Sequence, residues 1–188
     1  DDVRAEIYRN LAKIARDENH YEYAKDLINA GLNLKNIRKK TGDMLRLSLA
    51  ELYNFHLCDS NEAIKAYLTL QEGASYPNIK AKIALGNARH IDRYHSRNHW
   101  YLEALDILGK SGNIELRAQA LIGLGNARYI DRHHQSNTDW YLEALDLLGG
   151  HNNIDLRAQA LIGLGNARYT DKSHHGQHDW YLEALDVL

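Results

Sequence analysis

The sequence has a single cysteine, Cys58, and a single proline, Pro77, among its 188 residues. A lone cysteine excludes a framework of disulfides within this chain and fits a reducing compartment, so we expect a cytoplasmic protein. No apolar run approaches the roughly 20 residues that a membrane span needs, and we expect no membrane partner. The formal net charge of −2 includes no basic surplus, which disfavours nucleic acid as the partner.

Motifs of catalysis are also missing. The sequence has no phosphate-cradling glycine loop, no paired histidines of the HExxH type and no nucleophile motif. Cys58 lies near His56, but no other residue supports a cysteine nucleophile. We therefore expect neither an enzyme nor a bound cofactor. Because the chain begins at Asp1 without a methionine and stops at Leu188 inside an apolar helical pattern, we interpret it as a piece of a longer protein.

An internal repeat dominates the sequence. Residues 114–148 return almost letter for letter at 154–188, and a shorter version occupies 83–108. A period of about 40 residues is typical of stacked helical hairpins. Apolar residues at helical spacing, with asparagine before and glycine after many segments, predict the helices themselves. The expected helices cover residues 2–18, 21–31, 43–57 (or from near 34), 61–72, 79–92, 98–108, 114–131, 138–148, 154–171 and 178–188.

Paired in order, these helices form five antiparallel hairpins in a single array. The expected units are residues 1–33, 34–76, 77–112, 113–152 and 153–188. Trp140, Tyr141 and Leu142 are consecutive, and apolar residues on nearly all sides of a helix indicate burial on nearly all sides. A stacked neighbouring hairpin can supply that cover, whereas one partner helix cannot. Gly123 and Gly125 favour close approach of helix backbones in the first helix of the unit.

The repeated residues resemble a known family. The pattern Ala-x-Ala-Leu-x-x-Leu-Gly-Asn-Ala at 118–127, followed by Trp140-Tyr141-x-x-Ala-Leu, is similar to the tetratricopeptide repeat (TPR). Residues 158–167 with 180–185 repeat it, and residues 21–24 and 59–64 resemble the start of the family's second helix. The repeat length of about 40 residues resembles the class of Pins-type scaffolds and Rap-type regulators. The arginines at 89, 128 and 168 depart from the pattern, because they replace the usual tyrosine.

The resemblance implies an all-α, right-handed α-solenoid that binds protein or peptide along a concave wall made by the first helix of each hairpin. An asparagine after Leu-Gly hydrogen-bonds the ligand backbone in peptide-binding members, and an amide suits this role because it offers a donor and an acceptor. Alternatively, Leu-Gly-Asn-Ala is only the commonest sequence of the family at this position, and the asparagine has no role in binding. The predicted partner-binding residues are Asn87, Asn126, Asn166, Lys80, Gln119, Gln159, Ile83, Ile122, Ile162, His90, Tyr129 and Tyr169. These residues are not strongly charged as a set, so a highly acidic peptide is not the expected ligand.

Histidines gather in the loops between the paired helices. His95 with His99 and His174 with His178 have the (i, i+4) spacing of a helical metal pair, but Thr138 breaks the pattern in the fourth unit. No cysteine or glutamate completes a set of four ligands, so we expect solvated loop residues and no metal site. The predicted first helices of the third, fourth and fifth units also carry an arginine three residues before an aspartate, at 89/92, 128/131 and 168/171, which indicates a solvated surface ion pair.

The sequence therefore predicts a protein- or peptide-binding adaptor or scaffold. Two alternatives stay open. One is an RNA-binding protein whose repeats each read a base with two or three side chains. The other is a structural array that self-associates through its ends, because the apolar face beyond Leu188 has no partner helix in the chain.

Overall fold

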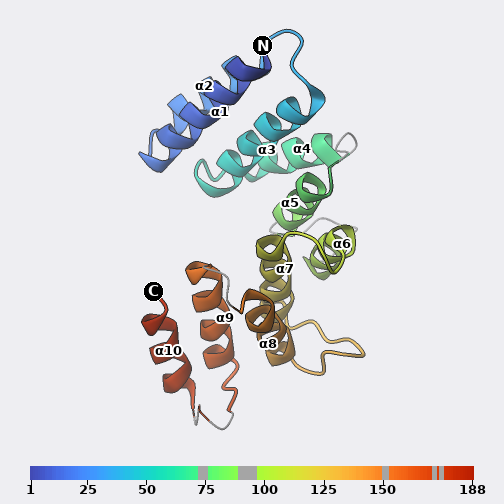
Figure 1. Cartoon of the computed structure of the whole chain (residues 1–188), viewed down its shortest axis with the longest axis vertical. Helices are drawn as coiled ribbons and strands as arrows, with labels where there is room; N and C mark the ends of the chain where they lie inside the picture. The colour runs from blue at the N-terminus through green and yellow to red at the C-terminus, as the bar shows by residue number, and fades with distance from the viewer. Residues whose placement is uncertain (72–75, 89–96, 150–152, 171–172, 174–175) are drawn as a thin grey trace. The chain divides into compact units, whose positions relative to one another are not determined.

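The computed structural model describes residues 1–71, 76–88, 97–149, 153–170, 173 and 176–188. Within these residues it has ten α-helices and no strand, so the predicted all-α class is confirmed. Among the same residues, every helix is too short or too polar to cross a membrane. The chain divides into two units, Asp1–His90 and Ile91–Leu188, and each is described by itself (Figure 1).

Unit 1 contains five helices. They are α1 (Asp2–Asp17), α2 (Tyr21–Leu32), α3 (Lys39–Phe55), α4 (Ser60–Gln71) and α5 (Pro77–Asn87). α1 packs against α2 and α3 packs against α4, as the predicted hairpins require, while α3 also contacts α1 and α2. α5 contacts both α3 and α4. The largest fully buried side chains of this unit are Tyr67, Leu45, Leu52 and Ile83.

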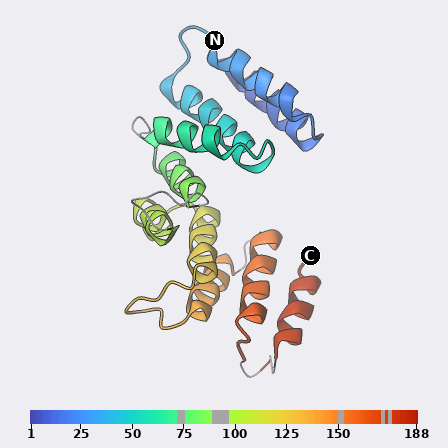
Figure 2. The same cartoon turned by 180° about the vertical axis from the view of Figure 1, so that it is seen from behind.

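Unit 2 contains the other five helices. They are α6 (Arg97–Leu108), α7 (Ile114–Asn126), α8 (Asn137–Leu148), α9 (Ile154–Asn166) and α10 (Gln177–Asp186). α7 pairs with α8 and α9 with α10, and α9 packs against both α7 and α8, as both views show (Figures 1 and 2). Trp140 on α8 is only 2% exposed, and it lies among Leu121, Leu124, Leu161 and Leu164. The prediction that α8 is covered by the next hairpin is therefore confirmed.

Two helix ends differ from the prediction. α7 and α9 end at Asn126 and Asn166, five residues before the expected ends at 131 and 171. Arg128 has a φ of 53° and Arg168 a φ of 56°, which is left-handed backbone that a helix cannot continue. The Tyr129 N–H donates to the Leu124 carbonyl at 3.1 Å and the Arg128 N–H to the Gly125 carbonyl at 3.0 Å, the hydrogen bonds of a Schellman motif. Arginine here occupies the position where glycine usually marks such an end.

Helix starts agree better with the sequence. The Asn113 side chain caps α7 by accepting a hydrogen bond from the Leu116 N–H at 3.0 Å. Asp59 accepts from the Glu62 N–H at 3.1 Å at the start of α4. The start of α5 was predicted two residues too late, because the helix begins at Pro77 and not at residue 79.

α1 presents an unexpected face to the core. Its buried residues are the small Ala5, Ala12 and Ala15, whereas Ile7 and Ile14 are about half exposed. The helical spacing of Ile7, Leu11, Ile14 and Ala15 in the sequence predicts that these residues face inward, and of the four only Ala15 does. Small residues let α1 lie close to α2 and α3, and the large side chains are left outside. On α2 the sequence predicts Tyr23, Leu27 and Ile28 on the inward face; Leu27 and Ile28 are buried, but Tyr23 is exposed.

The repeated glycines of the first helices make room for tyrosine rings rather than for a neighbouring backbone. A Cβ on Gly123 would lie 2.4 Å from the Tyr101 ring, and a Cβ on Gly163 would lie 2.5 Å from the Tyr141 ring. The prediction that the glycines allow two helix backbones to approach closely is therefore wrong. A tyrosine ring from the second helix of a hairpin packs against the glycines instead. In unit 1, Gly86 meets Tyr67 in the same way.

Candidate binding grooves

An open groove of about 270 Å³ lies among the first helices of unit 1. Its apolar side chains come from α1, α2 and α3: Ala12, Ala24, Ile28, Met44, Leu47 and Leu52. Its charged side chains are Arg9, Lys13, Arg16, Lys82 and Glu51. We call it the basic groove. Its volume is just below the range of about 300–1,000 Å³ of small-molecule pockets, so it suits one or two peptide side chains better than a large cofactor.

The cations of the basic groove differ in how well they are paired. Arg9 contacts Glu6 and Arg16 contacts Asp17, each at 2.9 Å, and Lys82 lies 3.5 Å from Glu51. Lys13 is exposed and has no ion pair or hydrogen bond to any residue that the structure describes. Partly exposed pairs of this kind are weak, so a ligand carboxylate can compete for the arginines at low cost. Lys13 offers a cation that no described carboxylate neutralises.

A second open cavity, of about 510 Å³, lies between α7 and α9 in unit 2. We call it the asparagine groove, because Asn126 and Asn166 both line it. The Tyr141 ring reaches this groove from α8, between Gly125 and Gly163. The Tyr141 hydroxyl donates to the Asn126 Oδ1 at 2.8 Å, and the Tyr181 hydroxyl donates to the Asn166 Oδ1 at 2.8 Å.

These hydrogen bonds orient the two amides. Burial raises the pKa of Tyr141, with a smaller opposing effect of the Arg128 charge, so the hydroxyl keeps its proton and remains a donor. Because the carbonyl oxygens of Asn126 and Asn166 accept from tyrosines, their N–H groups are the free side of each amide. Neither amide donates to a described residue. The asparagine groove can therefore offer donors to the carbonyl groups of a ligand backbone.

The structure places the predicted partner-binding residues in different environments. The structure brings Asn126 and Asn166 into one groove, and Gln119, Gln159 and Lys80 are exposed but line neither groove. Ile83 and Ile122 are 1% and 3% exposed, so they belong to the core and cannot meet a ligand, whereas Ile162 is exposed. Asn87 is buried, Tyr129 and Tyr169 are half-buried beside Trp140 and Trp180, and His90 lies outside the described residues.

The basic groove was not predicted from the sequence. A signal for it exists, because Arg9, Lys13 and Arg16 follow one another at spacings of four and three and so share one side of α1. The large apolar residues of α1 lie on the opposite side, and their helical spacing favoured that side as the inward face. Lys82 comes from α5, far away in sequence, and only the packing of α5 on α3 brings it to this groove.

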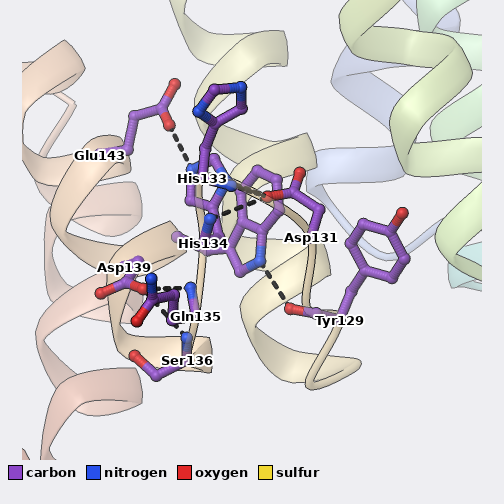
Figure 3. Close-up of polar contacts among 9 residues, drawn as sticks. Tyr129, Asp131, His133, His134, Gln135, Ser136, Asp139 and Glu143 are labelled. Atoms are coloured by element: carbon purple, nitrogen blue, oxygen red, sulfur yellow. Dashed lines mark hydrogen bonds and ion pairs between the residues drawn. The ribbon is translucent and has the colours of Figure 1, made fainter.

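The loop between α7 and α8 is closed by one histidine (Figure 3). The His134 ring stacks on the Trp140 indole with ring centroids 3.3 Å apart and planes inclined by 8°. Its Nδ1 lies 3.1 Å from Asp131 and its Nε2 lies 2.7 Å from Glu143 on α8. Asp131 thus accepts from the loop and is not the helical partner of Arg128 that the spacing had indicated.

Two further anchors hold the same loop. The Trp140 Nε1–H donates to the Tyr129 carbonyl at 2.7 Å. The Asp139 carboxylate accepts from the Gln135 and Ser136 N–H groups at 2.7 and 3.0 Å, at the start of α8. The sequence contained a signal for this arrangement, since Asp-x-x-His occurs at 92–95, 131–134 and 171–174, although the first and third copies lie outside the described residues.

The acid dependence of stability tests the loop. Burial raises the pKa of Asp131, but hydrogen bonds from the His134 and His133 N–H groups and from the His134 ring outweigh it, so the pKa falls below the ordinary aspartate value of 3.8. A carboxylate with a lowered folded-state pKa stabilises the fold above its unfolded pKa and loses that contribution as the pH falls through the folded value. We expect the stability advantage of the wild type over Asp131→Asn to shrink below pH 3.8 in urea unfolding. An advantage that stays constant over that range contradicts this prediction.

Among the described residues, no group of three or more histidine, cysteine, aspartate or glutamate side chains is arranged to hold a metal ion. Thr138, which interrupts the histidine spacing, is buried at the start of α8. Of the four histidines with (i, i+4) spacing, only His99 and His178 fall in described segments.

No protein-family model matches this chain, and neither a curated protein nor a solved structure matches it significantly.

Proposed function

We propose that this chain is a TPR-like array of helical hairpins, a right-handed α-solenoid, that acts as an adaptor by binding a segment of another protein. The helical pairs and the packing of α9 on the preceding hairpin support the array. The Leu-Gly-Asn-Ala repeats at 124–127 and 164–167 support the family resemblance. In this proposal the first helices of the hairpins carry the ligand.

The observation that carries the proposal is the basic groove. In this groove apolar side chains lie beside four cations and one carboxylate. These side chains come from α1, α2, α3 and α5, and the four helices are connected by the contacts α1–α2, α2–α3 and α3–α5. An extended peptide with one apolar side chain for the apolar part of the groove and carboxylates on either side matches this surface. The expectation that the ligand is not a highly acidic peptide concerned a different set of residues, between Lys80 and Tyr169, which as a set is not strongly charged.

Selection from a random peptide display library, with the 188-residue chain as bait, tests the proposal. We expect enrichment of peptides with aspartate or glutamate around an apolar residue. Binding of a selected peptide, measured by fluorescence polarisation, should weaken about tenfold in Lys13→Glu, since one lost charge contact is worth roughly 1.4 kcal/mol. Lys35→Glu is the matched control, because Lys35 is also exposed and unpaired among the described residues but lies outside the groove.

Two results would count against the proposal. One is a library that yields no enriched peptide, and the other is a selected peptide that binds Lys13→Glu as tightly as Lys35→Glu. A single-stranded RNA probe separates the alternative function. Binding of that probe with a steep loss of affinity on adding salt, in the absence of peptide binding, indicates an RNA-binding protein instead.

A further inference from the structure

The outer face of the last hairpin is apolar and exposed. Leu182 and Leu185 on α10 are 47% and 67% exposed, and Ile162 on α9 is 41% exposed. Isolated apolar residues at a surface need no explanation, but a contiguous set marks an interaction site. These three residues come from two helices packed together as one hairpin.

The preceding hairpin shows what covers this face. α7–α8 and α9–α10 are nearly identical in sequence, so Ile122, Leu142 and Leu145 correspond to Ile162, Leu182 and Leu185. In α7–α8 the same residues are buried or half-buried, and α9 is the helix that packs against both α7 and α8. The face of α9–α10 therefore has the chemistry of a surface that, one repeat earlier, receives the first helix of another hairpin.

A complementary surface lies on the first helix of the chain. Val3, Ile7, Leu11 and Ile14 on α1 are all exposed, and their spacings of four, four and three place them on one side of the helix. At a rise of about 1.5 Å per residue this row is roughly 16 Å long, enough to lie along a whole helical hairpin face. α1 is itself the first helix of a hairpin, as α9 is.

The charges of α10 disfavour a contact between two copies of the same face. α10 carries Asp179, Glu183 and Asp186 and no lysine or arginine. Docking two copies of α10 together would set carboxylates against carboxylates, which favours a partner helix of different sequence. On α1 the basic side chains Arg9, Lys13 and Arg16 lie on the side opposite the exposed apolar row, so they take no part in the contact.

We propose that a second copy of this chain docks its α1 face, Val3, Ile7, Leu11 and Ile14, on the α9–α10 face, Ile162, Leu182 and Leu185. The contact is heterologous, since two different faces meet. One copy keeps an unused α9–α10 face and the other keeps an unused α1 face. Association of this type continues from copy to copy instead of stopping at a symmetric dimer. This association does not involve the basic groove, so its test is independent of the proposed peptide binding.

Sedimentation equilibrium of the 188-residue chain and of two variants tests the inference. Ile7→Glu removes the α1 face and Leu185→Glu removes the α9–α10 face, and both residues are exposed, so neither change disturbs the core. The average mass of the wild type should rise with concentration through multiples of the monomer. Each variant alone should stay monomeric. An equimolar mixture of the two variants should double in mass, because one variant keeps the face that the other has lost.

Ile130→Glu is the control, as Ile130 is 61% exposed but belongs to neither face, and this variant should associate like the wild type. A monomeric wild type overturns the inference. Association that survives in Ile7→Glu or in Leu185→Glu overturns it as well, because a symmetric contact would then suffice. A mixture of the two variants that stays monomeric shows that the two faces do not bind each other.

Discussion

Gly163→Ala should lower the free energy of unfolding by about 2 kcal/mol, although alanine is favoured over glycine inside a helix by about 1 kcal/mol. The added Cβ would lie 2.5 Å from a carbon of the Tyr141 ring. The ring cannot move away from α9, because on its other side a Cβ position on Gly125 is only 2.7 Å away. Tyr141 is buried and its hydroxyl is held by Asn126, so the helices must separate to admit the methyl group.

Gly42→Ala is the matched control for this substitution. Gly42 is also a buried glycine inside a helix, but its added Cβ would approach the Arg46 guanidinium at 3.2 Å, the far end of a flexible side chain. We expect Gly42→Ala to leave stability unchanged or to raise it by up to about 1 kcal/mol through helix propensity. Urea unfolding midpoints of the two variants compare the effects. A Gly163→Ala protein as stable as Gly42→Ala would mean that Tyr141 is not confined between α7 and α9.

The tyrosine also connects packing to the asparagine groove. Tyr141 holds α7 and α9 at the separation that its ring requires, and the same side chain orients the Asn126 amide. A change that displaces the ring therefore alters the groove even where the fold survives.

The sequence revealed the helices better than it revealed their ends and their faces. Repeat period and apolar spacing located all ten described helices, because these signals depend on the helix itself. The ends of α7 and α9 escaped prediction, because Arg128 and Arg168 adopt the left-handed backbone without the glycine that usually signals it. The inward face of α1 escaped too, since close packing selected Ala5 and Ala12 over the larger Ile7.

The site was predicted only where its residues follow one repeated motif. Asn126 and Asn166 share a groove because they recur at the same place in consecutive repeats. Ile122 recurs in the same way but is buried, because α9 covers it, and sequence alone does not say which residue of a helix the next hairpin covers. The basic groove depends on the contact of α5 with α3, and no repeated sequence motif indicates this contact.

Replacing His134 with alanine should also destabilise the protein by about 2 kcal/mol. Stacking on an aromatic ring is worth about 1 kcal/mol beyond the buried area, and His134 lies flat on Trp140. Loss of the contacts to Asp131 and Glu143 adds about 1 kcal/mol, a modest figure because Glu143 is partly exposed. His133→Ala is the matched control. The adjacent His133 side chain is exposed, and its backbone N–H still reaches Asp131 when the ring is removed.

His134→Phe separates the two contributions, because phenylalanine can stack on Trp140 but cannot contact either carboxylate. We expect its unfolding midpoint in urea to fall between those of the wild type and His134→Ala. If His134→Phe is as stable as the wild type, the ring contact alone holds the loop and the two carboxylates contribute nothing. If His134→Ala is no less stable than His133→Ala, neither the stacking nor the contacts to the two carboxylates stabilise the hairpin. The indole of Trp140 would then depend only on its neighbours in the core and on the Tyr129 carbonyl.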